Sequence, residues 1–151
     1  MNAPKPPKSA RRQAREVALK GLYQWLVSKD ETGVILAQAH DYDEYPECDK
    51  RHFETLLQGC IDEWPELDRV MAKHIDRKIE ELSPVEHAVL MIGSWELMRS
   101  LDIPYRVVIN EAVELTKLYG ATDGHKFVNG VLDRIAYEVR TTETQTRAAL
   151  S

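Results

Sequence analysis

The chain has 151 residues, of which 43% are hydrophobic and 30% are charged, and its formal net charge at pH 7 is −5. These values are typical of one globular domain or of two small packed halves, and they exclude a disordered chain. No apolar run approaches the ~18 residues of a membrane span, and no apolar stretch of signal-peptide type follows the charged N-terminus. We therefore expect a cytoplasmic protein without a membrane segment.

The acidic total hides an uneven distribution of charge. Residues 1–15 contain five basic side chains and no acidic one, whereas residues 41–49 contain five acidic side chains and no basic one. A polyanion responds to the local field, so a basic segment can bind one despite an acidic total. The alternative interpretation is a solvated tail beside a solvated loop.

The first predicted element is a disordered basic arm over residues 1–10, which include three prolines. Apolar residues then recur at three- and four-residue spacing over residues 13–27 and predict a helix. Arg11, Arg12 and Arg15 fall at its first turn, where the helix dipole is positive and disfavours cations. This small cost suggests that the arginines are retained for a partner.

The middle of the chain predicts an acidic loop and then two helices. The loop covers residues 41–50, and Phe53 begins an amphipathic helix that ends near Trp64. Leu67, Met71 and Ile75 are spaced as on a further helix, and the three tryptophans are expected in the core: Trp25, Trp64 and Trp95.

The second half contains the clearest helix signals. Ser83, Pro84 and Glu86 form a capping box with proline at the first helical position. The helix that follows, to Arg99, is apolar on most of its circumference, which predicts a central, largely buried element. A helix from Pro104 is expected to end at the C-cap Gly120.

The last predicted helix runs from an N-cap at Asp123 to about Arg140, and residues 141–151 are expected to form a loose tail. It contains Asn129-Gly130, a strong hairpin signal, but the apolar residues after it keep helical spacing. Gly130 in a helix costs ~1 kcal/mol relative to Ala, so we expect another helix to approach closely there. The fold class is all-α, with short connections between neighbouring helices.

No arrangement of residues indicates catalysis. The five histidines are scattered, and the chain contains no HExxH, no GxGxxG, no P-loop and no GxSxG. Cys48 and Cys60 are too far apart for a CxxC motif and are expected to be inert reduced thiols. We expect no enzyme, no metal and no cofactor, which favours a binding protein by elimination.

Three stretches resemble the NusB family of bacterial transcription antitermination factors. The most specific is IPYRVVINEAVELTKLYGATDGHKFVNGVLDRIA, residues 103–136. SPVEHAVLMIGSWEL, residues 83–97, is similar to the preceding helix of the family, and RRQAREVALKGLYQWLVS, residues 11–28, to its N-terminal helix.

This resemblance implies one domain over residues 11–140, built from two small helical bundles packed across each other, with subdomains of about 11–80 and 81–140. It also implies a non-catalytic protein. Members of the family bind the boxA element of ribosomal RNA leader transcripts together with NusE, a small-subunit ribosomal protein. The pair then helps elongating RNA polymerase resist termination.

The resemblance also implies an RNA surface. Arginine and lysine pair with phosphates, and aromatic rings stack on the splayed bases of single-stranded RNA. The charge of Asp123 opposes RNA, so we expect Asp123→Asn to tighten binding. The expected RNA-binding residues are Arg11, Arg12, Arg15, Tyr23, Asp123, Lys126 and Phe127.

For the protein partner, the resemblance points to the exposed side of the helix over residues 83–99, with Glu86 and Arg99 as candidates. The chain departs from the family pattern at two positions. Met91 lies where relatives often carry a basic residue, which puts the partner contacts in question, and Gln13 interrupts an arginine run.

Two other functions stay open at this point. The chain could be a targeting domain for an RNA-modifying enzyme, although it ends before any cofactor-binding βαβ unit, or a self-associating helical protein. The resemblance also leaves open whether the resting protein is a monomer or a homodimer that hides the RNA surface.

Overall fold

The computed structural model describes residues 8–144, and within this range the chain folds without a β-strand. The all-α prediction is therefore confirmed. The helices are α1 (Ala10–Ser28), α2 (Thr32–Ala39), α3 (Lys50–Asp62), α4 (Trp64–Ala72), the short 3₁₀ helix η1 (Ile79–Glu81), α5 (Pro84–Arg99), α6 (Tyr105–Tyr119) and α7 (Gly124–Val139).

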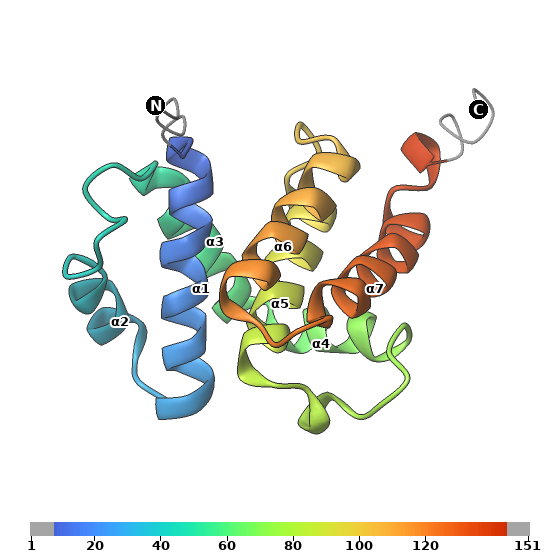
Figure 1. Ribbon diagram of the computed structural model, residues 1–151, viewed down its shortest axis with the longest axis horizontal. Coiled ribbons are helices and arrows are strands. Elements are labelled where there is room, and N and C mark those ends of the chain that lie inside the picture. Colours follow the sequence, from blue (N-terminus) through green and yellow to red (C-terminus); the bar gives the residue numbers. More distant parts are fainter. Residues whose placement is uncertain (1–7, 145–151) are drawn as a thin grey trace, which may run out of the picture.

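Helix α5 lies at the centre of the molecule. It packs against α1, α3 and α4 from the first half of the chain and against α6 and α7 from the second half (Figure 1). All ten residues from 88 to 97 are buried, as the apolar circumference of this helix predicts. The two groups of helices, α1–α4 and α6–α7, therefore meet on α5.

Serine side chains define the starts of α1 and α5. The Ser9 hydroxyl accepts from the Arg12 backbone N–H at 3.0 Å. The Ser83 hydroxyl accepts from the Glu86 N–H at 3.1 Å and donates to the Glu86 carboxylate at 2.8 Å. Each serine thus satisfies an N–H group that has no partner inside the helix. Ser9 and Ala10 belong to the start of α1 rather than to the arm, whose residues 1–7 lie outside the described range.

Helix α2 is not indicated by any signal in the sequence. It has only eight residues, includes Gly33, and receives no side-chain cap at its N-terminus. Local propensity for a helix is therefore low. Ile35 is fully buried and faces Gly21 of α1, so tertiary packing rather than propensity holds this segment in a helix.

Trp64 corrects one prediction about the core. Trp25 is partly buried and Trp95 is buried, but Trp64 is 45% exposed at the start of α4. Its ring packs on Trp25, with the ring centroids 6.4 Å apart. Because the Trp64-Pro65 pair begins α4 instead of ending α3, the indole points outward from the first turn.

Arg140 explains why the chain stays ordered beyond α7. Its guanidinium is buried and donates to four backbone carbonyls at the C-terminal end of α5 and in the turn that follows it. Residues 141–144 are helical and Thr144 is buried, so the loose tail expected over 141–151 is wrong for these four residues. The remaining residues lie outside the described range. The four carbonyls belong to Glu96, Leu97, Ser100 and Ile103.

Gly130 lies inside α7, as its helical surroundings predict, but no other helix of residues 8–144 approaches it closely. A Cβ atom added at Gly130 would meet only the Arg134 side chain, at 3.5 Å. Close packing occurs instead at Gly59, where a Cβ would lie 2.4 Å from the buried indole of Trp95. That indole cannot easily move, because it donates to the Glu63 carboxylate at 2.7 Å.

These two glycines predict opposite effects of alanine. Gly59→Ala should destabilise the fold by ~1–3 kcal/mol through overpacking, whereas Gly130→Ala should stabilise it by ~0.5–1 kcal/mol by restricting the unfolded chain. Urea unfolding followed by circular dichroism measures both. A loss of stability in Gly130→Ala would show that the helix surface there is covered after all.

Candidate nucleic-acid interface

Two of the predicted RNA-binding residues share one side of α1. Arg12 and Tyr23 are separated by eleven residues, which is about three helical turns, so their side chains project in nearly the same direction. The Arg12 guanidinium donates two hydrogen bonds to Glu111 of α6, at 2.9 and 3.0 Å. Tyr23 is 44% exposed. This side of α1, next to α6, is one part of the candidate surface.

Arg11 lies at the exposed start of α1 and has only a loose partner. Its Nε is 3.8 Å from a carboxylate oxygen of Asp49, and about half of its side chain is exposed. A weak ion pair between exposed groups contributes little to stability. Arg11 can therefore exchange Asp49 for an incoming anion.

Arg15 does not lie on this surface, and its assignment as an RNA contact is wrong for this structure. Its side chain is buried and donates to both carboxylate oxygens of Glu96 on α5, at 2.8 and 2.9 Å. His52 of α3 contacts the same carboxylate at 3.1 Å. Arg15 thus joins α1 to the centre of the fold, and phosphates cannot reach it.

The environment of Glu96 keeps it ionised. Burial alone would raise its pKa, but hydrogen bonds from His52 and Arg15, together with their charges, outweigh burial and lower the pKa below the ordinary value of 4.5. The carboxylate thus remains the anionic partner of a buried guanidinium.

The second part of the candidate surface is the start of α7. Asp123 occupies the N-cap position with φ of 68°, and its side chain makes no capping hydrogen bond. Its carboxylate instead lies 3.4 Å from the Lys126 ammonium, and both groups are exposed. Asp123 was expected to cap α7 through its side chain. It instead precedes the helix in the left-handed backbone conformation, which Asp tolerates.

Phe127 is partly buried, because its ring packs against the hydrophobic core and is also covered by an arginine. The Arg77 guanidinium lies 4.1 Å from the centre of the Phe127 ring, a cation–π contact. Arg77 belongs to the loop between α4 and η1 and has no helical periodicity, so no sequence signal links it to Phe127. The start of α7 therefore combines a lysine, an arginine and an aromatic ring.

The two parts are connected through the start of α5. Val85 lines the same cleft as Tyr23, and the adjacent Glu86 carboxylate lies near Gly124, the first residue of α7. Figure 1 shows α1 beginning at the top of the view and the turn before α7 in the lower half. The candidate surface therefore runs along α1 and α6 from Arg11 and Arg12 to the start of α7.

The expected protein-partner surface on α5 is not a continuous face. Residues 88–97 are buried, including Met91, which is fully inaccessible. Glu86 and Arg99 lie at opposite ends of the helix, and Arg99 donates to Glu63 of the α3–α4 junction at 2.6 and 2.9 Å. The prediction of one exposed side of α5 is therefore wrong, because every side of its middle is covered.

No candidate metal centre is found among residues 8–144. No group of three or more His, Cys, Asp or Glu side chains there could hold a metal ion. Cys48 and Cys60 are buried and unpaired, and burial raises the pKa of the Cys60 thiol well above its usual value. None of the described helices has the length and apolar character needed to cross a membrane.

A helical bundle that presents arginine, lysine and aromatic side chains along one surface defines a helical binding protein. Comparison with known proteins makes the class specific, because residues 12–137 match the NusB family. A relative, the transcription antitermination protein NusB of Cupriavidus pinatubonensis, is 53% identical over 142 residues, which make up 94% of this chain and 85% of that protein. The chain belongs to the NusB family.

Solved structures agree with this assignment. A structure of T. maritima NusB is similar with a TM-score of 0.77 and 30% identity, over 92% of this chain and 99% of that one. A chain from a crystal structure of the antitermination factors NusB and NusE in complex with double-stranded RNA gives a TM-score of 0.74 and 28% identity, over 84% of this chain and 96% of that one.

The buried ion pair predicts how stability depends on pH. Because the pKa of Glu96 is lowered in the folded state, its ionised form stabilises the fold above about pH 4.5, and this contribution is lost as pH falls through the lower, folded-state pKa. Glu96→Gln leaves Arg15 buried without an anion and should cost about 3 kcal/mol or more at neutral pH. Its stability should also fall less steeply in acid than that of the wild type.

Urea unfolding of both proteins over a pH series tests this expectation, with Glu54→Gln as the control because Glu54 is an exposed carboxylate on α3. Equal stability of Glu96→Gln and wild type at neutral pH would contradict the structural role given to the pair.

Proposed function

We propose that this protein is a non-catalytic transcription antitermination factor that binds boxA-type single-stranded RNA of ribosomal RNA leader transcripts together with NusE. In this proposal the complex modifies elongating RNA polymerase, and the protein acts in the cytoplasm, where bacterial transcription takes place. Membership of the NusB family supports the proposal, since the relatives that this chain matches are named transcription antitermination proteins. A related chain was crystallised with NusE and RNA.

The observation that carries the RNA-binding part is the composition of the surface between α1 and the start of α7. It presents Arg11, Arg12 and Lys126 as cations and Tyr23 and Phe127 as aromatic rings. Cations that contact phosphates and rings that stack on unpaired bases are the combination that single-stranded RNA requires. Arg77 joins this set through its contact with Phe127.

The contact with NusE remains a prediction without a defined surface. A single face of α5 cannot provide it, because the middle of the helix is buried. Glu86 lies beside the start of α7, so a partner that reaches it would also lie next to the RNA. Arg99 is exposed at the other end, near Trp64 and the α3–α4 junction. A homodimer likewise stays a prediction.

Direct binding measurements test the proposed function. Fluorescence anisotropy with boxA-type RNA and a scrambled RNA, over a salt series with and without NusE, should show tighter binding to boxA when NusE is present. Replacing Arg11 and Arg12 by Ala should reduce the salt slope, by about 0.7 for each phosphate that the variant no longer neutralises. Phe127→Ala should weaken binding by ~1–3 kcal/mol with little change in salt slope.

Arg69→Ala is the matched control, because Arg69 is exposed on α4 and pairs with Glu66 one turn earlier on the same helix. It should bind as the wild type does. Failure of the wild type to bind either RNA at low salt, even with NusE, would refute the proposed function.

Asp123→Asn should tighten RNA binding several-fold. Asn tolerates the left-handed conformation at this position, and the change removes a negative charge and frees Lys126 from its ion pair. Because both groups are exposed, the gain should shrink at high salt. Dissociation constants at two salt concentrations measure it, with Asp133→Asn, on the exposed side of α7, as the control. Unchanged or weaker affinity would contradict this role of Asp123.

A further inference from the structure

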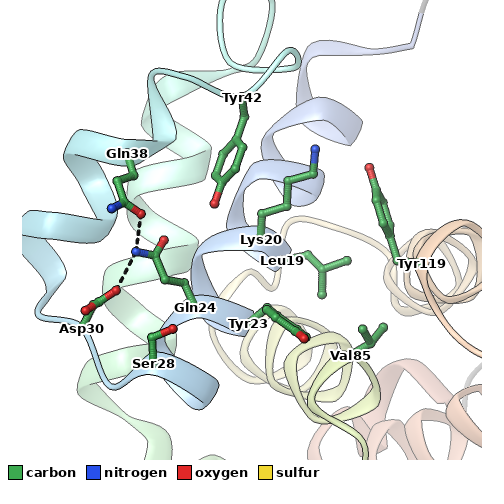
Figure 2. A pocket seen from close by; sticks show the side chains of 10 residues that line it. All are labelled: Leu19, Lys20, Tyr23, Gln24, Ser28, Asp30, Gln38, Tyr42, Val85 and Tyr119. Atoms are coloured by element: carbon green, nitrogen blue, oxygen red, sulfur yellow. Dashed lines mark hydrogen bonds between the residues drawn. The ribbon is translucent and has the colours of Figure 1, made fainter.

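A cleft beside α1 has features that the phosphate and stacking contacts above do not use. Its volume is about 630 Å³, within the range of small-molecule sites. Three tyrosines from separate elements line it: Tyr23 of α1, Tyr42 of the loop after α2, and Tyr119 at the end of α6. Figure 2 shows these side chains around the cleft, together with Lys20 and Gln24 of α1. A cleft lined in this way is suited to an aromatic ligand.

Gln24 offers this cleft a hydrogen-bond acceptor. Its amide nitrogen donates to a carboxylate oxygen of Asp30 at 2.8 Å and also to the side-chain oxygen of Gln38. A carboxylate only accepts hydrogen bonds, so Asp30 fixes which end of the amide is nitrogen. The Gln24 oxygen therefore faces away from Asp30, toward the Tyr42 side of the cleft (Figure 2).

This oxygen is buried and accepts no hydrogen bond from residues 8–144. Buried polar groups are nearly always paired, because an unpaired one loses its interaction with water without compensation. Because the oxygen itself has almost no accessible surface, an N–H donor from a ligand in the cleft would supply the missing hydrogen bond after a small shift of the Gln24 amide or its neighbours. The site thus selects for a ligand that combines a flat ring with an N–H group.

The charges around the cleft favour a hydrogen-bond donor over a phosphate as this ligand. The Lys20 ammonium is held by both carboxylate oxygens of Glu44, at 2.8 and 2.9 Å, and lies 5.1 Å from the centre of the Tyr42 ring. Its charge is therefore already neutralised. Asp30 contributes a carboxylate to the lining itself. Carboxylates repel phosphate but favour donor groups such as amines.

Tyr119 also remains a donor under all ordinary conditions. Burial and the neighbouring carboxylates of Glu16 and Glu44 raise the pKa of its hydroxyl well above the usual value. The hydroxyl donates to Glu16 at 3.2 Å, which holds the ring at the α6 side of the cleft. Tyr119 is thus held in place before any ligand enters.

We propose that this cleft holds one unstacked nucleobase of the bound RNA, a base with an exocyclic amino group that donates to the Gln24 side-chain oxygen. The Tyr23 and Tyr42 rings provide the stacking surface. Uracil fits less well, because it has no exocyclic amino group and its single base N–H lies between two carbonyl oxygens. This inference rests on the proposed function and adds a base-selective subsite to it.

An abasic scan of the RNA tests the subsite and at the same time identifies the nucleotide that occupies it. Each nucleotide of a boxA-type RNA is replaced in turn by an abasic residue, and binding is measured for wild type and for Gln24→Met, which keeps the length of the side chain but lacks its acceptor. For the wild type, one position should cost roughly tenfold in affinity, the scale of one stacked and hydrogen-bonded base. Uracil at that position should also weaken binding.

Gln24→Met should bind the intact RNA more weakly by a similar factor and lose the additional penalty at that one position. Gln58→Met is the matched control, since Gln58 is exposed on α3 and donates to Asp62 of the same helix. Its abasic profile should match the wild type. Tyr42→Leu provides a second test of the same position should Gln24→Met lose its helical circular dichroism signal.

The outcomes separate the two proposals. If wild type and Gln24→Met both bind intact RNA and their abasic profiles superimpose at every position, the subsite is refuted while the proposed function stands. If the wild type does not bind intact RNA with NusE present, the proposed function itself fails and the subsite fails with it.

Discussion

The buried ion pair between Arg15 and Glu96 is the interaction on which the rest of the structure depends. Two charges removed from water are tolerated only when they meet with good geometry, and here both guanidinium–carboxylate hydrogen bonds are shorter than 3 Å. The pair joins α1, the first helix, to α5, the central one, and His52 adds α3 at the same carboxylate. Because a bidentate pair admits little rotation, it fixes how α1 is turned about its own axis.

The rotation of α1 determines what the surface presents. With Arg15 directed inward, Arg12 and Tyr23 both turn toward α6, where Arg12 meets Glu111. Lys20 and Gln24 then face the cleft on the other side of Tyr23. One buried contact thus positions the phosphate-binding end of the surface and the proposed base subsite together. A helix turned by one residue, or about 100°, would bury Arg12 and break both.

The sequence alone predicted most of the helices, but it placed fewer of the candidate RNA-binding residues correctly. The apolar circumference of α5 and the capping box at Ser83 are local signals, and the structure confirms what they predict. Helix α2 could not be predicted, because its eight residues are held by packing against α1, where Ile35 meets Gly21. Arg15 was misassigned because its partner lies 81 residues away. The signal that could have found it is Glu96, a carboxylate in an otherwise apolar helix, which requires a buried cation.

The pairing of cations on the candidate surface accounts for an RNA-binding function in an acidic protein. Arg11, Arg12 and Lys126 each face a carboxylate, on Asp49, Glu111 and Asp123 respectively. RNA phosphates would replace these carboxylates rather than bind unpaired cations. Each contact therefore contributes only the difference in free energy between two ion pairs. Such a surface binds nonspecific polyanions weakly. Affinity then has to come from stacked bases and from a partner protein that adds contacts. Such a distribution of the binding free energy is expected of a factor that must act on one RNA element among many transcripts.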